Sequence, residues 1–330
     1  LSNFPNLRSI SVNKNPDDFN YFKTLMTSCP LLDSVFISYK PSFRVHTLNK
    51  KWIDEVGKLL ETVKAFSIKV IYSLFENSND YEKIIKLLLA QMKLIEEIEI
   101  TANFSDYEFL KSLPNLHRLY FTLNYIKTED INRLCQSDQE FLDKIELFDA
   151  RPTPDPLDGY SLILTKFRKL KDMTFCNLNN VSNRPLNELI PNMINLEILK
   201  YDCCSFQGSV FKIALDNIKY VRFLNSKLSN RIFISPMRNL EVLFLNRVDI
   251  IPLSEDSLIL PFYKLSVYCT NLKCLVLTDF LHNGLTSFKV QSYNVYKNIF
   301  EEISKLNNIG NIFIKFTSDI GFIYTDPGHD

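Results

Sequence analysis

The chain has 330 residues, of which 46% are hydrophobic and 23% charged, a balance that excludes a disordered chain and supports a large buried core. Lys plus Arg and Asp plus Glu each number 38, so no net charge attracts nucleic acid or an anionic membrane, and we expect neither as a partner. The sequence shows no basic, apolar leader and no apolar run of about 18 residues, so we expect neither secretion nor a membrane span.

Seven cysteines are present, and two of them, Cys203 and Cys204, are adjacent. An odd number that includes an adjacent pair favours reduced thiols over a disulfide framework. We therefore expect an intracellular protein, cytoplasmic or nuclear.

An apolar pattern, L-x-x-L-x-L with any large apolar residue at each L, recurs twelve times. Its last residues alternate and predict a short strand in each copy. In chain order the copies are Leu7/Ile10/Val12, Leu32/Val35/Ile37, Val63/Phe66/Ile68, Ile95/Ile98/Ile100, Leu116/Leu119/Phe121, Leu142/Ile145/Leu147, Leu170/Met173/Phe175, Leu196/Leu199/Tyr201, Ile218/Val221/Phe223, Leu240/Leu243/Leu245, Leu272/Leu275/Leu277 and Ile309/Ile312/Ile314. The mean spacing is about 27 residues, which is typical of a solenoid. We expect residues 1–330 to form a single array of about twelve irregular units.

The segments between these strands predict return segments that cover the strands. Apolar side chains recur at helical spacing in residues 52–63 and 81–92. Thr128, followed by two acidic residues, predicts a helix start. The stretch ARPTPDPLDGY, residues 150–160, holds three prolines and predicts a loop, which is either a simple connector or a docking or regulatory loop.

The residues that flank the strands identify the type of repeat more specifically than the apolar pattern does. PNL or a close variant precedes five strands, as in LPNLHRLYF and CTNLKCLVL, and L-x-x-x-C-x-x-L-x-x-L occurs twice, at Cys29 and Cys269. In these features nearly the whole chain resembles the leucine-rich repeat superfamily, specifically the cysteine-containing, ribonuclease-inhibitor-like type found in F-box proteins. The resemblance implies an α/β fold, a right-handed solenoid or horseshoe with a curved parallel sheet on the concave side and irregular helices on the convex side.

The resemblance also implies an Asn or Cys that hydrogen-bonds backbone groups in the turn after each strand. Asn15, Asn103, Asn124 and Cys204 hold this position, with Ser226 and Thr317 as polar substitutes. The six remaining units have other residues there, namely Lys40, Ile71, Ala150, Leu178, Val248 and Phe280, so we expect a broken polar ladder and looser turns. Cys29 and Cys269 are expected to fill apolar positions behind the strands.

The sequence gives catalysis little support. Its seven glycines form no G-x-G-x-x-G, Walker-type loop or G-x-S-x-G elbow, and no two of the four histidines have metal-ligand spacing. Acidic clusters such as Glu96, Glu97 and Glu99 are interpreted as solvated faces. We therefore expect no enzyme activity, no cofactor and no metal.

One position in each strand points away from the core toward the concave side. Along the array this column reads Ser11, Phe36, Ser67, Glu99, Tyr120, Glu146, Thr174, Lys200, Arg222, Phe244, Val276 and Phe313. Aromatic and Arg side chains are typical of protein-binding surfaces, although strands favour aromatic residues in any case. The residues expected to bind a partner are Tyr120, Glu146, Lys200, Arg222 and Phe244.

These observations predict a non-catalytic module that binds a protein substrate on its concave face. The resemblance to F-box proteins implies an F-box before Leu1, a Skp-type adaptor bound to it, and a role as substrate receptor of a cullin-based ubiquitin ligase. The alternative is an interaction scaffold or inhibitor that has the same concave site and no link to ubiquitin. A third possibility, an enzyme, requires titratable groups to converge, whereas Glu146 and Lys200, two units apart, are expected ~10 Å from each other.

Overall fold

The computed structural model of the protein divides into two compact units, Leu1–Thr174 (unit 1) and Phe175–Asp330 (unit 2). It describes residues 4, 6–12, 24, 27–39, 54, 57–58, 60–61, 63–70, 83, 86–100, 107–121, 126–136, 139–149, 152–153, 156–178, 189–206, 210–211, 214–229, 233, 235–251, 264–278 and 300–315. The division falls within strand β9 (Asp172–Cys176).

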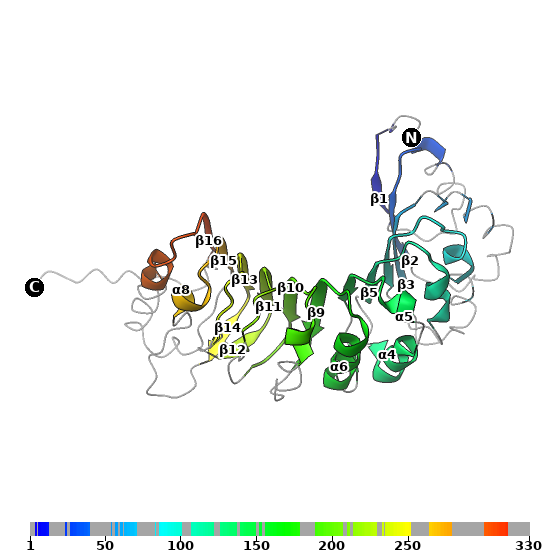
Figure 1. Ribbon diagram of the computed structural model, residues 1–330. Helices are drawn as coiled ribbons and strands as arrows, with labels where there is room; N and C mark the ends of the chain where they lie inside the picture. The colour runs from blue at the N-terminus through cyan, green and yellow to red at the C-terminus, as the bar shows by residue number, and fades with distance from the viewer. Residues whose placement is uncertain are drawn as a thin grey trace, which may run out of the picture. The chain divides into compact units, whose positions relative to one another are not determined.

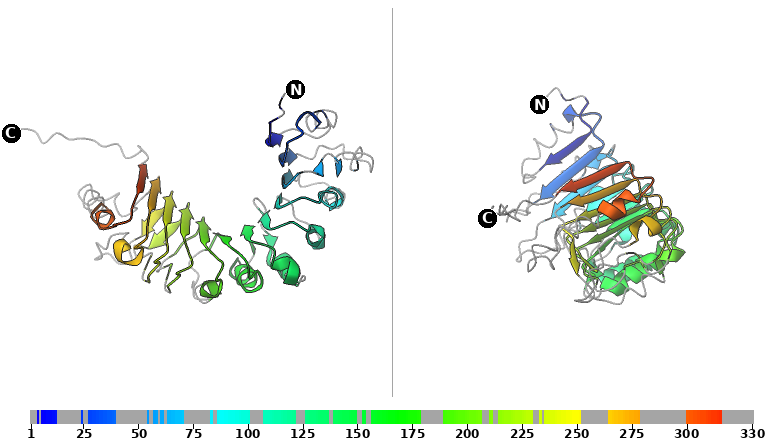
Figure 2. Two further views of the ribbon diagram at one scale, coloured as in Figure 1. Left: turned by 45° about the horizontal axis from the view of Figure 1, so that its top comes forward. Right: turned by 90° about the vertical axis from the view of Figure 1, so that its left-hand side faces the viewer.

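Unit 1 is built from parallel strands that pair in sequence order. These are β1 (Ser9–Val12), β2 (Ser34–Tyr39), β3 (Ala65–Val70), β4 (Glu97–Ile100), β5 (Arg118–Phe121), β7 (Leu147–Asp149) and the first residues of β9. The return segments include η2 (Glu108–Ser112), α4 (Thr128–Cys135), α5 (Gln139–Leu142) and α6 (Pro156–Lys166). Helices α4 and α6 lie side by side on one face of the strands (Figures 1 and 2).

Unit 2 repeats the arrangement with strands of five residues each. Strands β10 (Ile198–Asp202), β11 (Tyr220–Leu224), β13 (Val242–Asn246), β15 (Cys274–Thr278) and β16 (Asn311–Lys315) pair in parallel. A second parallel ribbon, β12 (Lys227–Ser229) with β14 (Asp249–Ile251), lies behind them, and short helices η3 (Ile190–Asn192) and α8 (Leu265–Tyr268) precede β10 and β15. Part of the return path is therefore extended where helices were expected.

Short parallel strands joined through return segments define a leucine-rich repeat solenoid, and the predicted fold class is confirmed. The inward residues of neighbouring strands meet in register, as Leu199↔Val221 and Leu243↔Leu275 do. These four side chains are all 0% exposed. Ile312 in β16 occupies the same column but is 43% exposed, so burial decreases at this strand.

The register corrects one predicted strand. The pattern Leu142/Ile145/Leu147 places Ile145 at the inward position, but β7 pairs Phe148 with Leu119. Phe148 is fully buried, and Leu142 ends α5 instead of preceding a strand. The wrong frame was chosen because Leu142, Ile145 and Phe148 are all apolar at three-residue spacing, so two overlapping frames fit.

The turns after β9, β10, β11 and β13 each use one left-handed residue. Asn177, Cys203, Asn225 and Arg247 have φ between 49° and 57°. Their N–H groups donate to the carbonyl that ends the following strand at 2.9–3.0 Å; for example, Asn225 donates to Asn246. This repeated bend turns the chain away from the sheet.

The next position holds the predicted polar ladder. The Cys204 thiol donates to the Phe175 carbonyl at 3.4 Å, and the Cys204 N–H donates to Ser226 Oγ at 3.1 Å. Ser226 Oγ in turn donates to the Leu224 carbonyl at 2.7 Å. The roles predicted for Cys204 and Ser226 are confirmed, whereas Asn15, Asn103, Asn124 and Thr317 lie outside the described residues.

The apolar cysteines and the PNL asparagines also have structural roles. Cys29 and Cys269 are 2% and 0% exposed, as predicted. The PNL asparagine Asn115 donates from its amide to the Lys93 carbonyl of the preceding repeat at 3.1 Å. Asn308, at the corresponding position of the sequence NNI before β16, donates likewise to the Thr270 carbonyl at 2.9 Å. The motif recurs because each repeat anchors its turn to the previous one.

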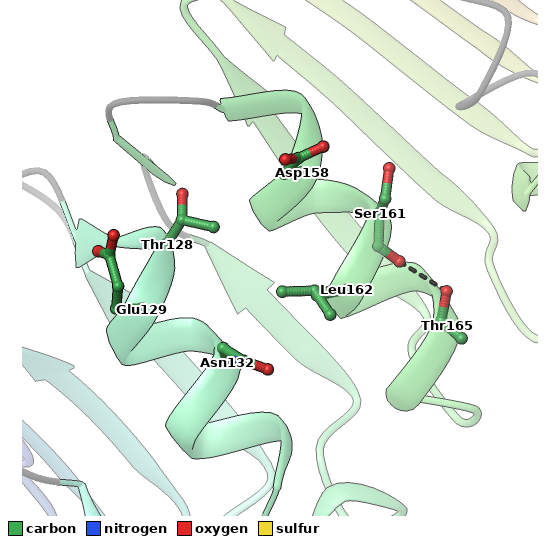
Figure 3. Close-up of a pocket in the computed structure, with 7 residues that line it drawn as sticks. All are labelled: Thr128, Glu129, Asn132, Asp158, Ser161, Leu162 and Thr165. Atoms are coloured by element: carbon green, nitrogen blue, oxygen red, sulfur yellow. Dashed lines mark hydrogen bonds between the residues drawn. The ribbon is translucent and has the colours of Figure 1, made fainter.

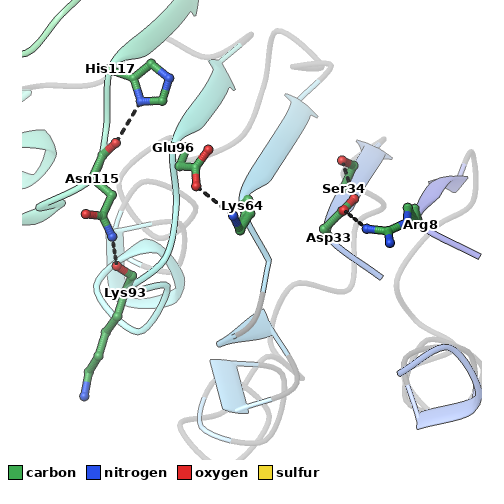
Figure 4. A network of polar contacts seen from close by, with 8 residues as sticks. All are labelled: Arg8, Asp33, Ser34, Lys64, Lys93, Glu96, Asn115 and His117. Carbon is green, nitrogen blue, oxygen red and sulfur yellow. Dashed lines mark hydrogen bonds and ion pairs between the residues drawn. The ribbon is translucent and has the colours of Figure 1, made fainter. Parts of the chain in front are cut away.

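Immediately before the strands, charges alternate in sign from repeat to repeat, which the sequence reading missed. In unit 1 the order is Arg8, Asp33, Lys64, Glu96, Glu146 and Lys171, with His117 between Glu96 and Glu146, and in unit 2 it is Glu197, Lys219, Glu241 and Lys273. Ion pairs join Arg8–Asp33 and Lys64–Glu96 at 3.4 and 3.0 Å (Figure 4). Glu146–Lys171, Glu197–Lys219 and Glu241–Lys273 form ion pairs at 2.7–2.9 Å. Exposed pairs of this kind each contribute little stability, but like charges at the same positions would repel, so the ladder favours the native pairing.

The proline-rich stretch predicted as a loop is instead largely regular, and that prediction was wrong. Pro152 and Thr153 form β8, which pairs with β6 (Ile126–Lys127), and α6 begins at Pro156. Proline is well suited to the first turn of a helix because the N–H it lacks would have no partner there. The predicted helix start at Thr128 is confirmed for α4, with Lys127 in the cap position.

We predict that Leu199→Asp or Leu243→Asp lowers the unfolding free energy of unit 2 by more than about 3 kcal/mol, since each buries an unpaired carboxylate in a core shared by neighbouring repeats. Chemical denaturation followed by circular dichroism measures this. Val267→Asp is the control, because Val267 is 60% exposed. An unchanged melt for either core variant would contradict the inward assignment.

Candidate functional site

Three of the five predicted binding residues lie next to one another on the sheet face of unit 2. Lys200 pairs in register with Arg222, and Arg222 pairs with Phe244. They occupy the outward positions of β10, β11 and β13, and all three are half-buried. The structure therefore brings these residues together in one column, which continues through Val276 to Phe313.

Tyr120 lies in unit 1, at the outward position of β5. Its register neighbours are Glu99 on β4 and Asp149 on β7. Burial, together with the negative charge of Glu97, raises the pKa of Tyr120 to about 12. The phenol therefore stays neutral at physiological pH and can donate a hydrogen bond from an acidic surface.

Glu146 does not occupy the outward column, so the position predicted for it was wrong. It precedes β7 and belongs to the alternating ion pairs, where it accepts a hydrogen bond from Lys171 Nζ at 2.7 Å. This bond holds the pKa of Glu146 below its ordinary value. Asp149 takes the predicted place beside Tyr120, so an acidic residue still occupies the column.

The sheet face of unit 2 carries further polar groups that the sequence reading missed. Arg222 Nε, Asn246 Oδ1 and Thr278 Oγ1 are buried and have no hydrogen-bond partner among the residues that the structure describes. Asn246 and Thr278 are neighbours in register, two positions beyond Phe244 and Val276. The alternation of each strand could have predicted these outward positions, but it could not have shown that the atoms lack partners.

A separate groove lies between α4 and α6 in unit 1. It has a volume of about 490 Å³ and is lined by Thr128, Glu129, Asn132, Asp158, Ser161, Leu162 and Thr165 (Figure 3). The Thr165 hydroxyl donates to the backbone carbonyl of Ser161 at 2.7 Å and so turns back onto its own helix. The groove is wide open, and its polar groups come from the first turns of α4 and from successive turns of α6.

The thiols and acids give no sign of a metal centre among the residues that the structure describes. No group of three or more His, Cys, Asp or Glu residues is positioned to hold a metal ion in these ranges. All seven cysteines are free thiols, and Cys203 is the exposed one. Burial raises the pKa of Cys204 and Cys269, so both thiols stay protonated. Within the same ranges, no helix has the length and apolar character to cross a membrane.

Comparisons with known proteins were made on both sequence and structure. No family model and no curated protein matches the sequence. Among solved structures, the chain is similar to internalin C2 from Listeria monocytogenes, with 16% identity over 69% of this chain and 73% of that one and a TM-score of 0.32. It is similar to the leucine-rich repeat protein LegL7 from Legionella pneumophila, with 10% identity over 89% and 98% and a TM-score of 0.47. It is also similar to TLR13 in its complex with ssRNA13, with 16% identity over 94% of this chain and 40% of that one and a TM-score of 0.39.

The ion pair of Glu146 makes a small contribution to the stability of unit 1 that acid removes. Because the folded pKa of Glu146 is lowered, its contribution to stability is present above its ordinary pKa of 4.5 and is lost as pH falls through the folded value. We expect Glu146→Gln to lower the unfolding free energy at pH 7 by at most about 1 kcal/mol, since solvent screens this exposed pair. Chemical denaturation of the parent and of Glu146→Gln should give different unfolding free energies at pH 7 and equal ones in acid.

The control for this prediction is the variant Lys171→Gln, which removes the partner of Glu146. In that background, Glu146→Gln should have little effect at either pH. An effect of equal size in both backgrounds would show that Glu146 acts through another group.

Proposed function

We propose that the protein is a recognition module that binds a protein partner through the sheet face of unit 2. The observation that carries the proposal is the column Lys200, Arg222 and Phe244, which presents two cations and an aromatic ring on adjacent parallel strands. The opposite faces of these strands are held by fully buried side chains, among them Val221. A rigid sheet that presents Arg and aromatic side chains has the composition of a binding hot spot.

The residues beside the column support the same proposal. Tyr220 and Leu224 lie two positions from Arg222 on the same face of β11, and both are half-buried. Phe313 at the far end of the column is 58% exposed. A protein partner would cover this aromatic and aliphatic surface, whereas a small metabolite needs an enclosed pocket.

A finer version of the proposal assigns the module to an F-box type receptor of a cullin-based ubiquitin ligase. It rests on the resemblance carried by Cys29, Cys204 and Cys269, whose buried positions fit a cysteine-containing repeat. Its partners would be a protein substrate on the sheet face and a Skp-type adaptor on an F-box before Leu1. A scaffold or inhibitor without a link to ubiquitin would use the same face, and co-purification of adaptor and cullin with the intact protein separates the two.

We predict that Arg222→Glu combined with Phe244→Ala weakens capture of the partner at least tenfold, because the change reverses a charge and removes an aromatic anchor. The variant should stay folded and lose less stability than Leu199→Asp or Leu243→Asp, since both replaced side chains point outward and are only half-buried. Quantitative comparison of proteins retained by immobilised parent and variant chains measures the effect.

The matched control combines Arg238→Glu with Val267→Ala, two exposed positions of unit 2 outside the sheet face. It should capture the same proteins as the parent. If the sheet-face variant captures the partner as well as the parent does, the binding site must lie elsewhere on the molecule.

A further inference from the structure

Arg222 is the most unusual side chain on the sheet face of unit 2. Its Nε is buried and has no hydrogen-bond partner within the described part of the chain. Lys200 and Phe244 lie beside it in register, and Tyr220 and Leu224 flank it along β11. A charged donor removed from water without an acceptor is unfavourable, so the position favours a ligand that brings an acceptor. A guanidinium binds planar carboxylates through two parallel hydrogen bonds.

Two more buried polar atoms belong to the next two strands of the sheet, β13 and β15. Asn246 Oδ1 and Thr278 Oγ1 have no hydrogen-bond partner and belong to neighbouring strands. An amide oxygen accepts hydrogen bonds, and a hydroxyl can donate or accept. Because Asn246 and Thr278 are half-buried residues, rotation of each side chain can present these atoms to the backbone N–H and C=O groups of a peptide.

The spacing between these groups fits one extended peptide. Asn246 is one strand away from Arg222 and two residues further along the register. Strands are ~4.8 Å apart and rise ~3.4 Å per residue, which places the two Cα atoms roughly 8 Å apart. Two or three residues of an extended chain cover that distance.

The acids around Arg222 are already engaged. Asp202 accepts hydrogen bonds from Asn225 Nδ2 at 3.3 Å and from the Cys203 thiol at 3.4 Å. Glu197 and Glu241, before the strands, pair with Lys219 and Lys273. These acids therefore do not neutralise Arg222, whose guanidinium lies on the outward face of β11.

We propose that the partner segment is an extended acidic peptide whose Asp or Glu carboxylate binds Arg222 while its backbone hydrogen-bonds Asn246 and Thr278. This inference rests on the proposed function and adds the chemistry of its partner. Tyr220 and Phe244 hold the residues on either side of the acid. A single carboxylate suits this site better than a phosphate, whose larger charge calls for a denser group of cations.

Nucleic acid fits the same face less well. Strands that bind single-stranded RNA combine stacking aromatic rings with a basic groove along the backbone. Outward positions of β10 to β16 carry Lys200, Arg222 and Lys315 as cations and Asp202 as an acid, and the aromatic residues Tyr220, Phe244 and Phe313 are separated by apolar ones. This arrangement of charges favours contact with a single acidic group. It does not provide a continuous basic surface for the phosphates of a nucleic acid.

The test is a selection from random peptides of about eight residues, long enough to cross the five strands. The full chain is the target, and enriched peptides are synthesised for affinity measurement at physiological salt. We expect an Asp or Glu at one fixed position in the enriched peptides. Versions with Asn or Gln at that position should bind at least tenfold more weakly, and phosphoserine there should give no gain.

A double-mutant cycle then assigns the acid to Arg222. Arg222→Gln should weaken binding of the acidic peptide at least tenfold and have little effect on its Asn or Gln version. Arg222→Lys keeps the charge but cannot form two parallel hydrogen bonds to a carboxylate. Its affinity for the acidic peptide should lie between those of the parent and Arg222→Gln. Arg238→Gln is the matched control and should bind like the parent, with melting curves confirming that every variant is folded.

The outcomes separate this inference from the proposed function. If the selected peptides are neutral and their binding depends on Phe244 but not on Arg222, the proposal of an acidic peptide is overturned. The proposal that this face binds a protein would still stand. Tight binding of a mixed-sequence single-stranded RNA without enrichment of any peptide would overturn both. Enrichment of phosphoserine peptides over acidic ones would replace the carboxylate with a phosphate and overturn the proposal as stated.

Discussion

Each repeat of this protein depends on the side chain that its strand points inward, because that side chain packs between its counterparts on the neighbouring strands. In unit 2 the first inward column contains Leu199, Val221, Leu243 and Leu275, and none has measurable exposure. A second column stacks Phe175, Tyr201 and Phe223, with ring centroids 5.2 and 4.8 Å apart. No single strand could bury these groups, so the outward face exists only as a consequence of the shared core.

The same in-register packing places chemistry at fixed positions on each strand. Once Val221 is directed inward, Arg222 must point outward, and its partners across the strands are decided by the register. The polar positions before the strands follow the same rule and form the alternating ion pairs. The turn residues Cys204 and Ser226 link one repeat to the next through hydrogen bonds. The packing of the repeats therefore fixes the positions of the side chains on the surface proposed for recognition.

The sequence was sufficient to predict the inward residue of a strand where only one alignment of the apolar pattern is possible. It was insufficient where two alignments fit. Leu142, Ile145 and Phe148 are all apolar, so the pattern alone could not choose between Ile145 and Phe148 as the inward residue. In residues 150–160 the prolines suggested a loop, although Pro156 occupies the one helical turn that tolerates it. The outward column was predictable because it needs only alternation. The unpartnered atoms of Arg222 and Asn246 were not, because they depend on how neighbouring side chains fill the space around them.

The most direct test of the central claim is a nuclear Overhauser measurement on protein with selectively labelled Leu and Val methyl groups. The account predicts contacts from Leu199 to Val221, from Val221 to Leu243 and from Leu243 to Leu275, because these side chains are consecutive in one buried column. It predicts no contact from Leu243 to the methyl groups of Val242 or Val276 through the core, since both point to the other face. Core contacts that join Leu243 to Val276 instead of Leu275 would contradict the register and the surface built on it.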